Sequence, residues 1–423
     1  MSVPVHHNSR REFLRLLAAS PALPYLNLPS DWTSAIRRLR GGAPDPAYGQ
    51  TAQPDDLITA AKDALDVFDF EPVARKNLPP AHFGYMATGT DDDGTIRANR
   101  EGFNRYQLRV RRLVDGSKTD MSVSLMGKSW ETPIVINPVG SQKAFNPEGE
   151  VAVARAAKAK KHLQVLSTVS TSSIEEVIAA RGEPVWWQLY QQNDWARTRQ
   201  MIKRAEAAGA PVLVFTVDLL GGSNRETLIR GRRRDTRQCS ACHLDGNPTG
   251  DNRHRPMIAG IQPAPAEPEV GTPTWDFVKK LKDTTSMKVF IKGIVTREDA
   301  ELAFEHGASG MFVSNHGGRA EASERSTIEC VRDVVAGVAG RGPVIVDGGF
   351  RRGTDIFKAL ALGATAIGIG RPYVWGLAAF GQEGVETVLE LLRRELQMVM
   401  RQAGTQTVKQ ITSAYVIDRQ MRG

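Results

Sequence analysis

The sequence predicts one (β/α)8 barrel, an α/β fold of the TIM-barrel type, and three observations predict it. Eight short apolar segments recur along the chain between residues 133 and 370, and stretches with apolar residues at helical spacing lie between them. The segments are apolar throughout rather than alternating, as in strands buried on both faces. Eight strand–helix units in one domain-sized stretch favour a closed barrel. An open doubly wound sheet is the alternative, but it usually carries a glycine-rich turn after its first strand, and here such turns come late.

The predicted strands, in chain order, are Pro133–Asn137, Leu163–Val169, Pro184–Tyr190, Pro211–Asp218, Lys288–Lys292, Gly310–Ser314, Pro343–Asp347 and Ala366–Gly370. The predicted helices between and after them include Gly149–Lys160, Ser173–Ala180, Trp195–Ala208, Arg297–His306, Thr327–Val338 and Thr354–Leu362. Ahead of the barrel strands, the stretch from Leu57 to Leu78 has a helical pattern that stops at Pro79 and Pro80. We therefore expect the barrel domain to occupy residues 57–423.

The chain ahead of this domain has a different composition. Residues 1–30 contain the pair Arg10–Arg11 followed by an apolar stretch, the pattern of a twin-arginine export signal. Residues 31–56 fit a linker, because the stretch from about Gly41 to Pro54 is rich in Gly, Pro, Ala and Asp. We expect a periplasmic protein, and the alternative is a cytoplasmic protein with a disordered basic tail. No apolar run approaches the length of a membrane span.

The overall charge and its distribution favour a site for acidic small molecules over nucleic-acid binding. The net charge is +8, and the basic residues are spread along the chain apart from one cluster at 230–234. No nucleic-acid-binding motif accompanies them, so a site for acidic small molecules explains the surplus better than nucleic acid does. Three cysteines are too few for a disulfide framework.

Polar groups end nearly every predicted strand, where a barrel places its active site. At the last two strand ends, Gly349 and Gly370 let backbone N–H groups approach an oxyanion, and Arg351 and Arg371 add charge. A helix that starts after the eighth strand would add its positive dipole end. These features predict a phosphate site.

One histidine stands at the end of the sixth predicted strand. His316 lies between polar and glycine residues, and Asp218 at the end of strand four could orient its ring and stabilise its charged form. Arg225 and Arg319 form a carboxylate clamp in this interpretation. Lys292, at the end of strand five, is placed to neutralise negative charge on a reduced cofactor.

Together these residues resemble the FMN-dependent 2-hydroxy-acid oxidases and dehydrogenases, the family of glycolate oxidase, lactate oxidase and mandelate dehydrogenase. The similarity runs from about Asp69 to Ile417, and its signature is the segment Ser314–Arg319, with Lys292–Gly293, Thr216–Asp218 and Asp347–Asp355 around it. The resemblance implies oxidation of a small (S)-2-hydroxy acid, lactate-like, to the 2-keto acid. Electrons then pass to oxygen or to a respiratory acceptor, either a protein or a quinone. It also implies a homo-oligomer, a tetramer in the family.

Site roles follow from the same resemblance. His316 is the base and is paired with Asp218, while Lys292 and Tyr190 complete the catalytic set. The substrate is bound by Tyr85, Tyr190, Arg225 and Arg319. The implied FMN-binding residues are Pro138, Val139, Gly140, Ser167, Gln188, Thr216, Lys292, Ser314, Asp347, Gly348, Gly349, Arg351, Gly370 and Arg371. Another FMN barrel enzyme, isomerase-like, is the alternative, and a barrel that has lost catalysis and serves as an electron-relay protein is a second one.

Three positions depart from the family pattern. Val169 replaces a frequent Trp, Ala320 replaces the Gln after the signature arginine, and Leu220–Gly221 replaces a Pro-Arg pair. These positions shape the substrate pocket, so the departures favour a substrate larger or less usual than glycolate or lactate.

A long polar connection, residues 221–274, follows the fourth predicted strand, and a structureless loop of this length is functional or disordered. It contains Cys239 and Cys242 followed by His243, the attachment pattern of c-type haem, with Met257 or His254 as the second axial ligand. The alternatives are a disulfide, an unmodified loop, or a metal site, which would lack a clear fourth ligand. We expect no metal.

Overall fold

The computed structural model of the chain describes residues 57–192, 194–236, 255–261 and 272–421. The proposed export signal (residues 1–30), the linker (31–56) and the motif of Cys239, Cys242 and His243 lie outside the described residues. Within the described part of the chain, no helix is both long and apolar enough to cross a membrane.

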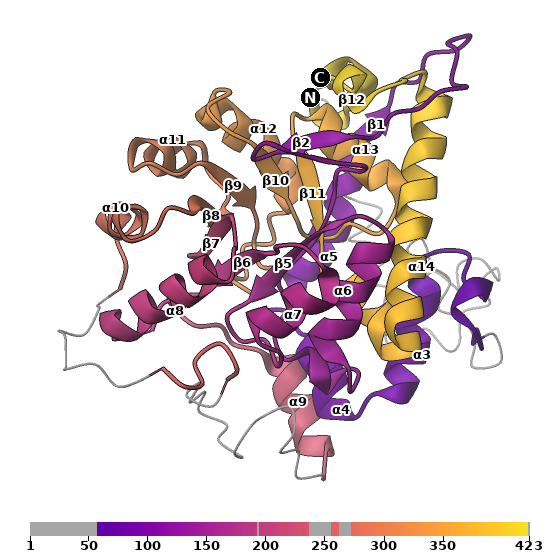
Figure 1. The fold of residues 1–423 in the computed structure, drawn as a ribbon. Coiled ribbons are helices and arrows are strands. Elements are labelled where there is room, and N and C mark those ends of the chain that lie inside the picture. The colour runs from indigo at the N-terminus through magenta and orange to yellow at the C-terminus, as the bar shows by residue number, and fades with distance from the viewer. Residues whose placement is uncertain (1–56, 193, 237–254, 262–271, 422–423) are drawn as a thin grey trace, which may run out of the picture. The chain divides into compact units, whose positions relative to one another are not determined.

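Eight parallel strands close into a barrel, with helices outside them (Figure 1). The strands are β4 (Ile134–Ile136), β5 (Leu163–Ser167), β6 (Trp186–Leu189), β7 (Val212–Thr216), β8 (Lys288–Ile294), β9 (Gly310–Val313), β10 (Val344–Val346) and β11 (Ala366–Ile369). Each pairs with its neighbour in the chain, and β11 pairs with β4 to close the barrel, Ile369 standing opposite Ile136. The predicted fold class is confirmed, and every predicted strand is present.

The helices are α3 (Phe70–Asn77), α4 (Pro80–Ala87), α5 (Gly94–Glu101), α6 (Gly149–Ala159), α7 (Ile174–Arg181), α8 (Trp195–Ala207), α9 (Glu226–Arg234), α10 (Trp275–Thr284), α11 (Arg297–Glu305), α12 (Thr327–Val338), α13 (Gly353–Ala361) and α14 (Arg371–Ala403). All six predicted barrel helices are confirmed. The last helix bends at Phe380 and Gly381, whose backbone angles are not helical. A short antiparallel pair, β1 (Tyr106–Leu108) with β12 (Val416–Asp418), joins the C-terminal segment to the rest of the domain.

The barrel interior has two layers because side chains two residues apart on a strand point the same way. The lower layer is apolar and is buried as one cluster. Its strand residues include Val135, Val165, Trp186, Val214, Phe290, Phe312, Ile345 and Ala366. Two positions further along each strand come Asn137, Ser167, Gln188, Thr216, Lys292, Ser314, Asp347 and Gly368, which we call the inner polar layer.

A hairpin that the sequence did not reveal packs against the apolar layer. Its strands are β2 (Val123–Leu125) and β3 (Lys128–Trp130), paired antiparallel. Leu125 and Trp130 are buried in the same cluster as the lower strand residues. The hairpin therefore covers the end of the barrel opposite to the inner polar layer.

Two predictions about local structure were wrong. The segment from Leu57 to Leu78 is not one helix, because Asp66 and Asp69 accept hydrogen bonds from the backbone N–H groups of Phe68 and Leu65. Two 3-10 turns, Ala61–Asp63 and Val67–Asp69, therefore precede the short helix α3.

The connection after β7 is not structureless throughout. Residues 226–234 form α9, and Gly84 of α4 and Gly231 of α9 let the two helices approach closely: a Cβ at Gly231 would stand 2.6 Å from the carbonyl oxygen of Pro80. Further along, Met257 and Ile258 are buried in the main hydrophobic core. Packing of this kind argues against Met257 as a haem ligand.

Candidate active site

The inner polar layer lies at the floor of a cavity at the carboxyl ends of the strands, and five of its members, Asn137, Ser167, Lys292, Asp347 and Gly368, line that cavity. Its members bond to one another: Ser167 donates to Gln188 Oε1 at 3.1 Å, and Gln188 donates to Thr216 Oγ1 at 2.9 Å. The empty space of the cavity together with its solvent-open mouth is about 850 Å³. Its predicted lining residues are Tyr85, Pro138, Val139, Gly140, Ser167, Tyr190, Lys292, His316, Arg319, Asp347, Gly348, Gly349, Arg351, Gly370 and Arg371.

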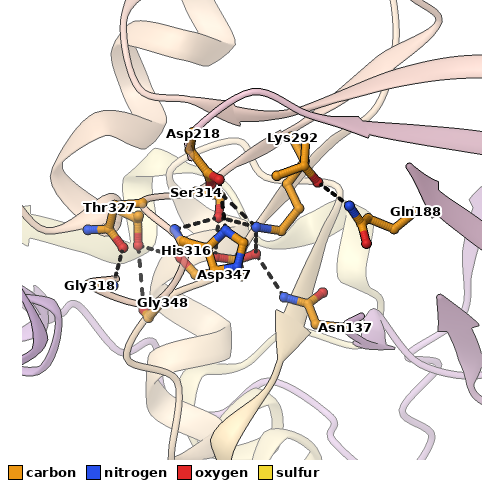
Figure 2. A network of polar contacts seen from close by, with 12 residues as sticks. Asn137, Gln188, Asp218, Lys292, Ser314, His316, Gly318, Thr327, Asp347 and Gly348 are labelled. Atoms are coloured by element: carbon orange, nitrogen blue, oxygen red, sulfur yellow. Dashed lines mark hydrogen bonds and ion pairs between the residues drawn. The ribbon is translucent and has the colours of Figure 1, made fainter. Parts of the chain in front are cut away.

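Lys292 lies at the centre of a buried charge network (Figure 2). Its Nζ donates to Ser314 Oγ at 2.8 Å and lies 3.6 Å from a carboxylate oxygen of both Asp218 and Asp347. The Ser314 hydroxyl in turn donates a hydrogen bond to Asp347 Oδ1 at 2.8 Å. Burial lowers the pKa of Lys292, but the two carboxylates outweigh burial, so its pKa lies above the ordinary value. The amine is therefore a fixed positive charge in the cavity wall.

His316 follows β9 in a left-handed backbone conformation, with φ of 57°, and Gly317 and Gly318 continue the same tight turn. Its Nδ1 lies 2.7 Å from Asp218 Oδ1, so Nδ1 carries the proton and donates it, because a carboxylate only accepts. The other ring nitrogen, Nε2, then accepts from the hydroxyl of Tyr190 at 3.2 Å. Burial lowers the pKa of His316 below its usual value, although Asp218 partly opposes this. A neutral imidazole with an available lone pair suits a general base.

Asp218 is held against the strand beside it. Gly293, with φ of 116°, has no Cβ, and a Cβ there would stand 2.7 Å from the Cβ of Asp218. Burial raises the pKa of Asp218, but His316 and Lys292 outweigh burial and bring that pKa below the ordinary value. The aspartate is therefore ionised: it accepts the Nδ1–H of His316 and lies beside the Lys292 cation.

Arg319 and Tyr85 form one wall of the cavity. The Arg319 guanidinium lies 4.9 Å from the Tyr85 ring centroid and donates to the Tyr85 carbonyl. Burial and the positive charge of Arg225 lower the pKa of Arg319 to about 9. Arg225 is close enough for this effect, but it is half-buried outside the cavity lining and donates to Ser223 Oγ at 2.9 Å. A bound carboxylate would relieve the repulsion between the two arginines.

The predicted phosphate end lies between β10 and β11 and the start of α14. Gly349 has φ of 83°, and a Cβ there would meet the Asn99 carbonyl oxygen at 2.2 Å, so only glycine fits. Arg351 is buried, and burial with the charge of Arg100 lowers its pKa to about 9. Arg371 instead donates to the carbonyls of Met86, Gly317 and Thr88.

This site fits FMN. At one end of the cavity, a buried arginine stands beside a glycine turn and a helix N-terminus. Lys292 supplies a positive charge further along the wall. One acceptor in the cavity wall, Asn137 Oδ1, also has no hydrogen-bond partner among the described residues. When bound, FMN accepts the two electrons that leave a substrate carbon.

The fold and the site define a flavin-dependent barrel oxidoreductase. Residues 74–418 match the family model described as FMN-dependent dehydrogenase, and the chain belongs to this family. Glycolate oxidase 3 of Oryza sativa subsp. indica is 39% identical over 83% of this chain and 96% of its own length. Glycolate oxidase 3 of Arabidopsis thaliana is 37% identical over 83% of this chain and 95% of its own length.

Solved structures agree. Mandelate oxidase with benzoyl-formic acid has a TM-score of 0.74 at 34% identity, covering 84% of this chain and 98% of that one. A chimera of (S)-mandelate dehydrogenase has the same TM-score at 30% identity, covering 84% and 99%. The protein is thus an FMN-dependent enzyme that oxidises 2-hydroxy acids, and the isomerase-like and non-enzyme alternatives are set aside.

Some predicted residues lie behind the cavity lining rather than in it. Gln188, Ser314 and Asp218 form hydrogen bonds with lining residues, and Thr216 accepts from Gln188. Lining residues that the sequence argument did not assign a role are Met86, Asn137, Gly317, Phe350, Gly368, Ile369 and Val374. Asn137 could have been found, since it stands two places after a buried strand valine, like the other members of the inner polar layer.

Proposed function

We propose that this enzyme oxidises (S)-2-hydroxy acids of lactate type and accepts larger side chains as well. The observation that carries the proposal is the His316–Asp218 pair beside buried Arg319, in one cavity with room for a flavin and an organic acid. Arg319, helped by Arg225, binds the substrate carboxylate. This places the carbinol carbon near His316.

His316 then takes one proton from the carbinol group on Nε2. The ring becomes a cation, and Asp218 stabilises that cation through the Nδ1–H bond. Tyr190, whose hydroxyl already contacts Nε2, turns to the substrate oxygen. Burial raises the pKa of Tyr190 well above the ordinary value, so it donates as a neutral phenol. Lys292 contributes its positive charge to the cofactor side of the cavity.

Val169 supports a substrate larger than lactate. It lines the cavity, where the family often has Trp, and Gly140 packs against it: a Cβ at Gly140 would meet Val169 Cγ2 at 2.5 Å. We expect kcat/KM for (S)-mandelate to equal or exceed that for glycolate. Val169→Trp should lower kcat/KM for mandelate by about 5- to 150-fold, since overfilling a packed site costs about 1–3 kcal/mol, while glycolate changes little. Equal losses on both acids would contradict this role of Val169.

The electron acceptor is proposed from the chain outside the barrel. The Arg10–Arg11 signal favours export, and the Cys239, Cys242 and His243 motif favours a covalent haem. Together they support a periplasmic dehydrogenase that passes electrons to a respiratory carrier rather than to oxygen. Fractionation of cells that express the full chain tests the location.

An anaerobic visible spectrum tests the reaction and the haem together. The protein is made in a host that matures c-type cytochromes, and L-lactate or (S)-mandelate is added. Bleached flavin bands alone mean a flavoenzyme whose cysteines carry no haem, which removes the haem proposal. A Soret band that shifts to its reduced form as the flavin bleaches supports the flavocytochrome. Flavin that no 2-hydroxy acid bleaches would overturn the proposed substrate class.

The family resemblance also leads us to propose a homotetramer. Light scattering coupled to gel filtration tests it, and a monomer would remove it.

A further inference from the structure

The last residue before the β4 end turn, Asn137, has its two amide atoms in different surroundings (Figure 2). Its side chain is 6% exposed. Nδ2 donates to Asp347 Oδ2 at 2.8 Å, whereas Oδ1 is buried and has no hydrogen-bond partner among the described residues. The same carboxylate oxygen of Asp347 lies 3.6 Å from Lys292 Nζ. Asn137 is thus joined to the charge network at the cavity floor.

The orientation of this amide is fixed by chemistry. Asp347 also accepts from Ser314 and lies beside the Lys292 amine, and a carboxylate only accepts hydrogen bonds. Asn137 must therefore turn its NH₂ group to Asp347. The amide therefore cannot be flipped, and its acceptor oxygen, Oδ1, points away from Asp347.

The neighbouring strand makes room for this amide. Gly368 of β11 stands beside β4, and a Cβ there would meet Asn137 Oδ1 at 2.1 Å and Cγ at 2.6 Å. At this position the inner polar layer has no side chain of its own, and Asn137 fills the space. Both residues line the cavity.

We propose that Asn137 binds the flavin directly, with Oδ1 accepting a hydrogen bond from an O–H or N–H group of FMN. A buried acceptor without a partner costs stability, and the cavity that it lines is where the cofactor fits. FMN offers two kinds of donor, the hydroxyls of its ribityl chain and the N–H of its ring. The proposal rests on the FMN site, not on any choice of substrate or acceptor.

The test measures FMN affinity without turnover. Apoprotein is titrated with FMN, and the quenching of flavin fluorescence gives Kd. Asn137→Leu keeps the volume beside Gly368 and removes the acceptor, so we expect Kd to rise about tenfold, the usual worth of one hydrogen bond. The rise in melting temperature that saturating FMN produces should shrink in step, because binding to the native state stabilises it.

Gln164→Met is the matched control. Gln164 Oε1 is also buried without a partner among the described residues, but it lies outside the cavity lining. Its FMN Kd should stay within twofold of the wild type. Asn137→Ala is measured in parallel and decides the question should the leucine variant fail to fold. An FMN Kd within twofold of wild type in the folded Asn137 variant would overturn the proposal.

A double-mutant cycle separates direct binding from an effect that acts only through Asp347. In an Asp347→Asn background, the loss caused by Asn137→Leu should persist, and its disappearance would overturn direct contact. Lumiflavin, which has the ring but no ribityl chain, identifies the donor. Weaker FMN binding with unchanged lumiflavin binding assigns a ribityl hydroxyl, and weaker binding of both assigns the ring N–H. Because no substrate is used, failure of the proposed function would leave these results unaffected.

Discussion

Replacement of Asp218 by Asn tests the reasoning about the catalytic base. Asp218 Oδ1 lies 2.7 Å from His316 Nδ1, and the two side chains are 4% and 18% exposed. At an effective dielectric constant of about 20, unit charges about 4 Å apart interact by about 4 kcal/mol. Asn keeps an oxygen that accepts the Nδ1–H bond, so orientation is retained while the charge is lost. We expect flavin reduction to slow by about 10²–10³-fold.

The assay is anaerobic stopped-flow measurement of flavin bleaching with saturating substrate. Asp299→Asn, at the half-buried start of α11 and outside the cavity lining, is a control for loss of a carboxylate and should reduce at the wild-type rate. Asp218 also raises the pKa of His316, so its removal should move the acid limb of the rate profile to lower pH. Reduction within fivefold of wild type, with full FMN content, would refute the assigned role of Asp218.

Further predictions concern the base, a glycine turn and the hairpin β2–β3. In the wild type, kcat/KM should rise with pH as His316 loses its proton and should then reach a plateau. The midpoint of this rise should lie below pH 6.5, because burial lowers the pKa of His316 and the neutral ring is the active form. A midpoint above pH 6.5 would point to another base. Gly349→Ala should prevent FMN binding, whereas Gly127→Ala, with a similar φ of 78° but open space, should leave the FMN Kd unchanged; equal Kd values would contradict the steric argument. Trp130→Ala should destabilise the protein by about 3–5 kcal/mol, seen as a lower melting temperature, without slowing flavin reduction. Slower flavin reduction would show that the hairpin β2–β3 influences the site.

Much of the fold could be predicted because the barrel strands are buried on both faces. Such strands are apolar throughout, and the pattern stands out in the sequence even when the strand has only three residues, as in β4 and β10. The hairpin β2–β3 could not be found in this way. Its burial pattern alternates in β2 and includes exposed residues in β3, so tertiary contact with the apolar layer determines it.

Helix α9 shows the opposite failure. Its sequence is rich in arginine, and Leu228 is its one buried residue among those described. The apolar pattern that would predict this helix from the sequence is therefore weak. Close packing of α9 against α4 at Gly231 accounts for the helix instead. The site was more predictable than this region because polar residues at strand ends must converge once the barrel closes. Asn137 was missed because an asparagine at a strand end is also typical of an ordinary turn.

The close packing of α4 on α9 has a consequence for the substrate pocket. Tyr85 lies on α4, and Arg225 is the residue that precedes α9. Since backbone meets backbone at Gly84 and Gly231, no side chain between the two helices can repack to absorb a change in spacing. Tyr85 and Arg225 are thus held at a fixed spacing from each other. A side chain at Gly231, whose Cβ would stand 2.6 Å from the Pro80 carbonyl oxygen, would displace Tyr85 and Arg225 together, and would alter which acids are accepted without touching the base or the flavin.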